Sequence, residues 1–320
     1  MIAIKEKPQK QILKAEIIGY DSGWGCRDYL CEDGPATVPA DHVLHKLRYL
    51  GVEAKWRGPL GLKFLGNHKL LNTKEKTLPL VTEGLKRLFN HVKHAVENNC
   101  IPVVIGGDHA SAIGTWSGVV SALHAEQKFG LIWLDAHLDA HTNETSKHGK
   151  WGGWWHGQPV SALTGEGIPQ LTEIGGVKPK ISPKHISMIG IHSFEPEEDA
   201  FVKTHGIRVY SLDEVTQRGF KAVYAEALQR ATEGTAGFGL TIDLDGFDAE
   251  SAPGVGTPET TGMSPAEVLP IIRSVARHPL FKALEIAEFN PHKDKNNKTR
   301  DLIGKIIESA FANTATGANS

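Results

Sequence analysis

The sequence predicts an α/β protein, with residues 1–320 forming a single three-layer α/β/α domain around a mainly parallel sheet. Strand-like and helix-like segments alternate along most of the chain, which is typical of a parallel sheet with helical crossovers. Several strand-like segments are uninterrupted apolar runs, as expected of buried strands. No low-complexity linker or internal repeat divides the series, so one domain is favoured over two.

Hydrophobic patterning places the elements in chain order. The first strand is expected at residues 15–20, and a helix at 80–99 has apolar residues at helical spacing. The other expected elements are strands at 101–105, 129–133, 185–191, 207–210, 238–242 and 283–287, and helices at 110–126, 197–204, 221–232, from 265 onward and at 298–311. This alternation predicts parallel strands joined by helices.

Local signals refine three segments. Ser264 is expected to N-cap a helix that has Pro265 in its first turn, with Glu267 completing a capping box. The Gly- and Trp-rich segment 145–157 directly follows a strand and its polar run, which favours a long functional loop over a linker. The tail at 312–320 is small and polar and is expected to fray.

Composition and charge exclude several classes of protein. The chain has 35 basic and 37 acidic residues and a net charge of −2, which provides no electrostatic footprint for nucleic acid or an anionic membrane. Three cysteines, Cys26, Cys31 and Cys100, argue against a disulfide framework and favour free thiols in a reducing compartment. The N-terminus lacks a signal-like apolar region and no stretch is apolar enough to cross a bilayer, so a cytoplasmic location is expected.

Carboxylate and imidazole side chains follow the ends of three predicted strands. Six such residues occur: His109; Asp135, His137 and Asp139; Asp243 and Asp245. Because open α/β sheets bind ligands beyond the carboxyl ends of their strands, we expect these side chains to lie together. Carboxylate oxygens with imidazole nitrogens suit a divalent cation such as manganese and suit copper poorly.

The charge of this set indicates two ions. Four of the six residues are carboxylates, which would repel one another strongly in one pocket without cations. Two divalent ions would balance that charge, and a pair of ions can lower the pKa of a shared water and present it as hydroxide. Any single Asp could instead be a turn former or an N-cap, but six such residues at successive strand ends favour a metal site.

Residues 106–109, 135–139 and 243–248 resemble the three signature motifs of the ureohydrolase family, which includes arginase and agmatinase. The resemblance extends from the first strand to Pro291 and implies an arginase-like α/β/α domain that binds two Mn²⁺ ions. It implies one ion on His109 and Asp139, a second on His137 and Asp245, and bridges from Asp135 and Asp243. It also implies a homo-oligomer, a trimer or a hexamer.

The resemblance also implies how a linear amidine, a small-molecule substrate, is hydrolysed. A metal hydroxide would attack the guanidinium carbon while Asp139 accepts a hydrogen bond from it, and the ions would stabilise the tetrahedral intermediate. His156 matches a histidine that passes a proton to the leaving amine, a task suited to imidazole. Glu288 matches a glutamate that pairs with the guanidinium, with a surface charge as the alternative. Thr257 matches a loop near the site.

Substrate recognition follows the resemblance less closely. His141 stands where arginases carry an Asn that recognises the α-carboxylate. Glu195 and Glu198, with Ser193 in place of one acid, resemble the acidic pair that binds the α-amino group, which would favour arginine. Three tryptophans of the loop could form a wall at the pocket mouth, pack the loop down or fill a subunit contact: Trp151, Trp154 and Trp155.

Arginine hydrolysis to ornithine and urea is therefore the expected activity. Residues 25–27, 32–35 and 156–159 favour arginase over agmatinase, whereas residues 252–255 and 287–291 also resemble formimidoylglutamase. Agmatinase and guanidino-acid hydrolase are further alternatives, because fold alone does not decide among them. A catalytically silent metal-binding relative is an alternative from another class, and the retention of all six ligands with His156 and Glu288 argues against it.

Overall fold

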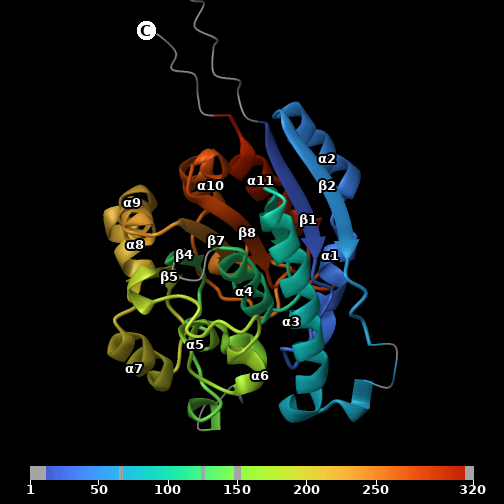
Figure 1. Cartoon of the computed structure of the whole chain (residues 1–320), viewed down its shortest axis with the longest axis vertical. Coiled ribbons are helices and arrows are strands. Elements are labelled where there is room, and N and C mark those ends of the chain that lie inside the picture. The colour runs from blue at the N-terminus through green and yellow to red at the C-terminus, as the bar shows by residue number, and fades with distance from the viewer. Residues whose placement is uncertain (1–11, 65, 67, 124–126, 148–152, 314–320) are drawn as a thin grey trace, which may run out of the picture.

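Eight parallel strands form one sheet in the computed structural model, which describes residues 12–64, 66, 68–123, 127–147 and 153–313 (Figure 1). Their order across the sheet is β2-β1-β3-β8-β7-β4-β5-β6. The strands are β1 (Leu13–Gly19), β2 (Val52–Pro59), β3 (Ile101–Ile105), β4 (Phe129–Leu134), β5 (Ile186–Ile191), β6 (Arg208–Ser211), β7 (Gly237–Asp243) and β8 (Phe281–Ala287). The predicted α/β class with a mainly parallel sheet is confirmed.

Helices cover both faces of this sheet and give the three expected layers. One face carries α2 (Ala40–Tyr49), α8 (Leu212–Arg218), α9 (Phe220–Thr232), α10 (Pro265–Ile272) and α11 (Lys298–Phe311). The other face carries α3 (Lys74–Glu97), α4 (Ser111–Ala122), α5 (Pro159–Thr164), α6 (Pro169–Thr172) and α7 (Pro196–His205). A short helix, α1 (Gly34–Thr37), lies near the β2 edge.

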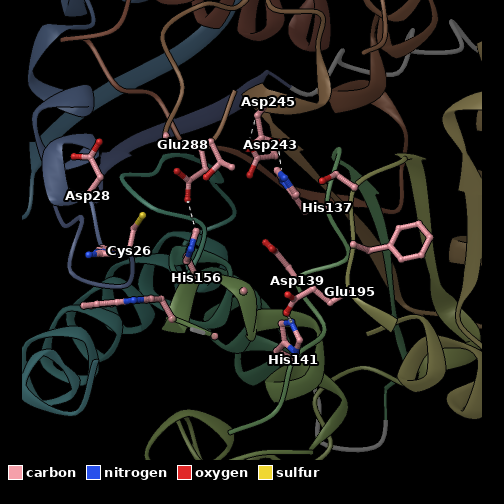
Figure 2. A pocket seen from close by; sticks show the side chains of 18 of the residues that line it. Cys26, Asp28, His137, Asp139, His141, His156, Glu195, Asp243, Asp245 and Glu288 are labelled. Carbon is pink, nitrogen blue, oxygen red and sulfur yellow. Dashed lines mark hydrogen bonds and ion pairs between the residues drawn. The ribbon is translucent and has the colours of Figure 1, made fainter. Parts of the chain in front are cut away.

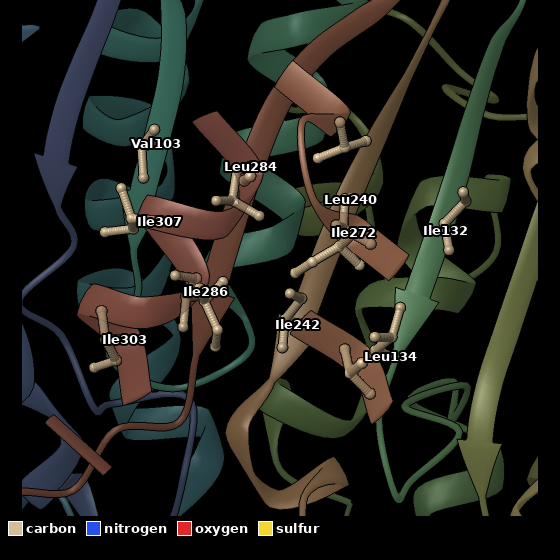
Figure 3. Close-up of a cluster of buried hydrophobic side chains, with 14 of the residues drawn as sticks. Val103, Ile132, Leu134, Leu240, Ile242, Ile272, Leu284, Ile286, Ile303 and Ile307 are labelled. Carbon is tan, nitrogen blue, oxygen red and sulfur yellow. The ribbon is translucent and has the colours of Figure 1, made fainter. Parts of the chain in front are cut away.

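Successive residues of the central strands enter two separate cores. In β3, Val103 and Ile105 pack toward α10 and α11, whereas Val104 packs toward α3 and α4. Figure 3 shows the first of these cores, where side chains from β3, β4, β7 and β8 meet those of α10 and α11. Burial on both faces explains the continuous apolar runs, since each fully buried aliphatic side chain contributes about 1.5–3 kcal/mol.

The predicted elements are present, with boundaries that shift by a few residues. The helix expected at 80–99 begins earlier, at Lys74, and the one expected at 110–126 ends at Ala122. The edge pair α2 and β2 was not predicted, because β2 exposes charged side chains at alternate positions and lacks an apolar run. The tail expected to fray begins with Ala312, which is buried and accepts a hydrogen bond from Arg277 at 2.8 Å, so the prediction is wrong at that residue. Residues 314–320 lie outside the described residues, and their fraying stays a prediction. No described helix is both long and apolar enough to span a membrane.

The helix start at Ser264 is partly as predicted. Ser264 does N-cap α10, but its hydroxyl accepts from the Ala266 amide at 3.2 Å. The expected bond from Glu267 back to Ser264 is not found among the described residues, because the Glu267 side chain is exposed to solvent. A reciprocal capping box forms instead at the N-terminus of α7, from Glu195 and Glu198.

A buried carboxylate joins three segments beneath the carboxyl end of the sheet. Glu285, in β8, is fully buried and accepts hydrogen bonds from the hydroxyls of Ser111 at 2.7 Å and Thr115 at 2.9 Å. The Thr241 hydroxyl of β7 also donates to it. Because buried polar groups need partners, this carboxylate fixes α4 and β7 against β8.

Replacing Glu285 with alanine is expected to lower the free energy of unfolding by about 2–4 kcal/mol, since three buried hydroxyls lose their acceptor. Urea denaturation would measure the change. The exposed Glu267→Ala is the matched control and should stay within about 0.5 kcal/mol of the parent. Equal stability of the two variants would contradict this role for Glu285.

Candidate functional site

Four neighbouring strands carry the predicted site residues to one edge of the sheet. In the order β3-β8-β7-β4, His109 follows β3, Glu288 follows β8, Asp243 ends β7 and Asp135 follows β4. Because the strands are parallel, their carboxyl ends lie side by side. This is the edge at which open α/β sheets bind ligands.

The six predicted ligands form two groups that share one residue. The first group is His109, Asp135, Asp139 and Asp243, and the second is Asp135, His137 and Asp245. Within each group the candidate ligand atoms lie within 4.8 Å of one another. Asp135 belongs to both groups, whereas Asp243, which the resemblance implied as a second bridge, falls in the first group only.

The surroundings of His109 fit a cation. Its Nδ1 lies 2.8 Å from a carboxylate oxygen of Asp243, 3.0 Å from one of Asp139 and 3.2 Å from one of Asp135. Although the ring is fully buried, neither nitrogen has a hydrogen-bond partner of acceptable geometry among the described residues. Buried donors are nearly always paired, so three oxygens crowded about one nitrogen resemble ligands around an ion. Stacking on Trp133, with ring centroids 4.3 Å apart, fixes the imidazole.

Crowding shifts the acidity of these carboxyl groups. Burial and the neighbouring Asp135 raise the pKa of Asp139 to about 7. Burial and Asp243 raise the pKa of Asp245 well above its usual range. Burial also disfavours the charge of Asp135, but its two histidine contacts hold the pKa of that carboxyl below its usual value. Because divalent cations would remove this repulsion, the residues present fit a two-ion site.

The backbone at the site includes two residues with positive φ and two closely packed glycines. Asp139 and Glu288 have positive φ, 47° and 65°, a strained region for residues other than glycine that is frequent at functional sites. A Cβ on Gly256 would lie 2.3 Å from the Glu288 carboxylate, and one on Gly107 would lie 1.9 Å from the Ser22 carbonyl oxygen. Glycine at these two positions lets the chain pack directly against the site.

A cavity of about 760 Å³ opens beside the cluster (Figure 2). Its lining includes seven carboxylate residues: Asp28, Asp139, Glu195, Glu198, Asp243, Asp245 and Glu288. Arg27 is the one lysine or arginine among the described residues that line it. The acidic lining favours a cationic ligand, and Thr257 also lines the cavity.

Glu288 and His156 face each other in the cavity (Figure 2), where Nδ1 of the imidazole lies 3.3 Å from Oε1 of the carboxylate. The Glu288 side chain is buried, and Oε1 also accepts from the His109 amide at 2.8 Å. Burial lowers the pKa of His156, but Cys26 and Glu288 outweigh it and raise that pKa well above its usual value. A protonated imidazole beside a buried carboxylate can donate a proton to a bound ligand.

His141, Glu195 and Glu198, which are predicted to bind the α-amino and α-carboxylate groups of the substrate, contact one another through hydrogen bonds and ion pairs. Nε2 of His141 lies 2.9 Å from Glu195, and its Nδ1 lies 3.1 Å from the Thr145 hydroxyl. Glu198 accepts from the amides of Ala140 at 3.1 Å and Glu195 at 3.0 Å. All three line the cavity, but both ring nitrogens of His141 are already engaged. His141 therefore fixes the carboxylate beside it.

The Trp-rich loop is fastened to the first turn of α3. Trp155 is buried, and its Nε1 donates to the Lys74 carbonyl oxygen at 2.8 Å. The Lys74 ammonium in turn donates to the Ser146 hydroxyl at 2.8 Å. Trp154 lines the cavity, so this loop both packs down and forms a wall. Trp151 lies outside the described residues.

Sequence reasoning assigned no role to several residues of the site, among them Arg27, Phe194 and Glu259. Arg27 and Phe194 line the cavity, and Phe194 is 49% exposed. Glu259 lies 3.3 Å from Nε2 of His137, although 122 residues separate them in the chain. A glutamate two residues after Thr257 carries no signal by itself, since exposed glutamates are common.

Comparison with known proteins identifies the family. The model of the arginase family matches residues 34–312. An arginase of Bacillus caldovelox is 36% identical over 280 residues, which cover 87% of this chain and 91% of that protein. An arginase of Brevibacillus brevis is 32% identical and covers 92% of this chain and 96% of its own. A crystal structure of arginase from Bacillus subtilis superimposes with a TM-score of 0.84 at 30% identity, covering 94% of this chain and 99% of its own. The chain therefore belongs to the arginase family.

Proposed function

We propose that the protein is a manganese-dependent arginase that hydrolyses L-arginine to L-ornithine and urea. The observation that carries this proposal is the pair of ligand groups sharing Asp135, with the buried carboxylate of Glu288 beside them in an acidic cavity. Relatives named arginase, one of them 36% identical over most of the chain, support the same activity.

In this proposal the six clustered residues hold two Mn²⁺ ions. His109 and Asp139 would bind one ion and His137 and Asp245 the other, with Asp135 and Asp243 between them. The ions, when bound, would supply a water of lowered pKa and stabilise negative charge at the reacting centre. Carboxylate oxygens with two imidazole nitrogens are the donor set that Mn²⁺ accepts.

The other side chains would bind the substrate and move protons. The Glu288 carboxylate would pair with the guanidinium and hold its carbon toward the cluster, because the planar fork of a guanidinium matches a carboxylate. His156, next to Glu288, would donate a proton to the departing amine, and Asp139 would accept a hydrogen bond from the attacking water. The cavity walls would limit the access of bulk water.

The far end of the cavity suits an amino acid. Glu195 and Glu198 present negative charge to an α-ammonium group, and His141 keeps the first of them in place. Arg27 is the one lysine or arginine of the described lining, so it would be the group there that attracts a substrate carboxylate. Thr257 adds a hydroxyl to the lining. Arginine carries both groups, whereas agmatine lacks the carboxylate.

A substrate panel tests the proposal. The Mn²⁺-loaded protein should release urea from arginine with a higher kcat/KM than from agmatine or guanidinobutyrate, and should act weakly on formimidoylglutamate. Chelator-treated protein is the control and should be inactive until Mn²⁺ is restored. Preference for agmatine would replace arginase with agmatinase, and inertness of the loaded protein toward every amidine would favour a silent relative.

Assembly and location are proposals of the same kind. We propose a homo-oligomer, trimer or hexamer, in the cytoplasm, without nucleic-acid partners. The near-neutral charge of −2 supports the last point. Size-exclusion chromatography with light scattering would measure the oligomeric state.

A further inference from the structure

His137 is contacted from two opposite sides. Its Nδ1 faces the cluster, 3.5 Å from a carboxylate oxygen of Asp135 and 3.4 Å from one of Asp245. Its Nε2 faces away, 3.3 Å from Oε1 of Glu259. Figure 2 shows His137 beside Asp243 and Asp245 at the cluster. One ring nitrogen is therefore available to an ion while the other meets a carboxylate.

The segment that carries Glu259 is held firmly at both ends. At one end, the Gly256 amide donates to the Glu288 carbonyl oxygen at 3.2 Å. At the other, the Met263 amide donates to the Gly246 carbonyl oxygen at 2.9 Å. The side chain of Glu259 is about a quarter exposed, so its position depends on this backbone. A partly exposed glutamate is ordinarily an anion at neutral pH, so a negative charge faces Nε2 of His137.

The two histidines of the cluster are supported differently. His109 is fully buried and stacks on Trp133, and its Nε2 has no hydrogen-bond partner among the described residues. His137 has a side chain that is 22% exposed, and the described residues show no aromatic ring stacked on it. The orientation of His137 thus relies on a polar partner, whereas packing holds His109.

We propose that Glu259 is a positioning residue that fixes the tautomer and orientation of His137 for one of the two ions. This inference rests on the proposed two-ion site. A proton held on Nε2 by Glu259 leaves the Nδ1 lone pair free for the ion, and the negative charge makes that lone pair more basic. Among the described residues Glu259 is not part of the cavity lining, and it contacts the cluster at His137.

Mn²⁺ titration of the chelator-stripped full chain by isothermal calorimetry tests the assignment. Glu259→Ala should raise the Kd of one ion by roughly 10–100-fold and leave the other unchanged, the size expected for loss of such a carboxylate. Glu259→Gln retains an acceptor without the charge and should fall between the parent and the alanine variant. Glu250→Ala, an exposed glutamate of the same connection, is the matched control and should bind both ions like the parent.

A double-mutant cycle identifies the affected ion. His137→Ala should weaken the binding of the same ion. Adding Glu259→Ala to it should cause no further loss of affinity, because Glu259 acts through the imidazole. Three results would each overturn the proposal: additive losses of Mn²⁺ affinity in the double variant, equally weakened binding of both ions in Glu259→Ala, or unchanged binding of both ions in Glu259→Ala. If the alanine variant does not fold, the glutamine variant and its cycle with His137→Ala decide by the same criteria. A protein that binds two ions but hydrolyses no amidine would refute the arginase proposal and leave this assignment standing.

Discussion

Replacing Asp135 with asparagine is expected to lower kcat/KM for arginine by at least about 10³-fold and to weaken the binding of both ions. Asp135 belongs to both ligand groups, so its charge is lost from both sites at once. Loss of a single preorganised donor at a reacting centre already costs roughly 10²–10³-fold. Removing the shared ligand also leaves His109 and His137 without their common carboxylate.

The asparagine variant should still fold. Its remaining oxygen can accept from Trp133 Nε1 or from the His137 amide, which lie 2.8 and 2.7 Å from the Asp135 carboxylate oxygens. Urea release and metal content after dialysis would measure the effect, with the exposed Asp213→Asn as the matched control. Two retained equivalents of metal together with activity within tenfold of the parent would contradict the shared role of Asp135.

Replacing Glu288 with glutamine is expected to reduce kcat/KM for arginine by roughly 30- to 4000-fold while both ions stay bound. Truncating one partner of a buried charge pair costs about 2–5 kcal/mol, and each 1.4 kcal/mol is tenfold. Glutamine has the same shape and can still accept from the His109 amide, so the turn before α4 keeps its hydrogen bond. The fall in kcat/KM therefore measures the contribution of the negative charge of Glu288.

Steady-state kinetics with metal analysis would separate this effect from loss of an ion. Glu267→Gln, an exposed glutamate at the start of α10, is the matched control. Activity close to that of the parent would show that Glu288 does not anchor the guanidinium. Loss of one metal equivalent would show that it supports the cluster instead.

The fold was predictable because the central strands are buried on both faces. The apolar runs of β3, β4 and β7 are visible without knowledge of their neighbours, and the polar residues that follow them include all six clustered ligands. The insertion of β8 and β7 between β3 and β4 was not predictable, because local patterning does not specify strand order. The contact of Glu288 with His109 depends on that order.

Other features depend on contacts between distant segments. Glu195 and Glu198 line the cavity and also form the capping box of α7. The resemblance of these acidic residues to a family pattern did not predict the hydrogen bonds of that capping box. Glu259 approaches His137 only through the path of the connection between β7 and α10. Sequence patterning reports which residues are buried, and it does not report which loops meet.

The attachment of the Trp-rich loop to α3 ties part of the cavity lining to a helix that lies outside that lining. Neither Lys74 nor any other α3 residue lines the described cavity, yet that lysine holds the loop that carries Trp154 into its wall. A helix that contributes no residue to the described lining therefore helps to position one residue of that lining. Under the proposed function, changes in the first turn of α3 would move Trp154 while the clustered carboxylates and histidines stay in place.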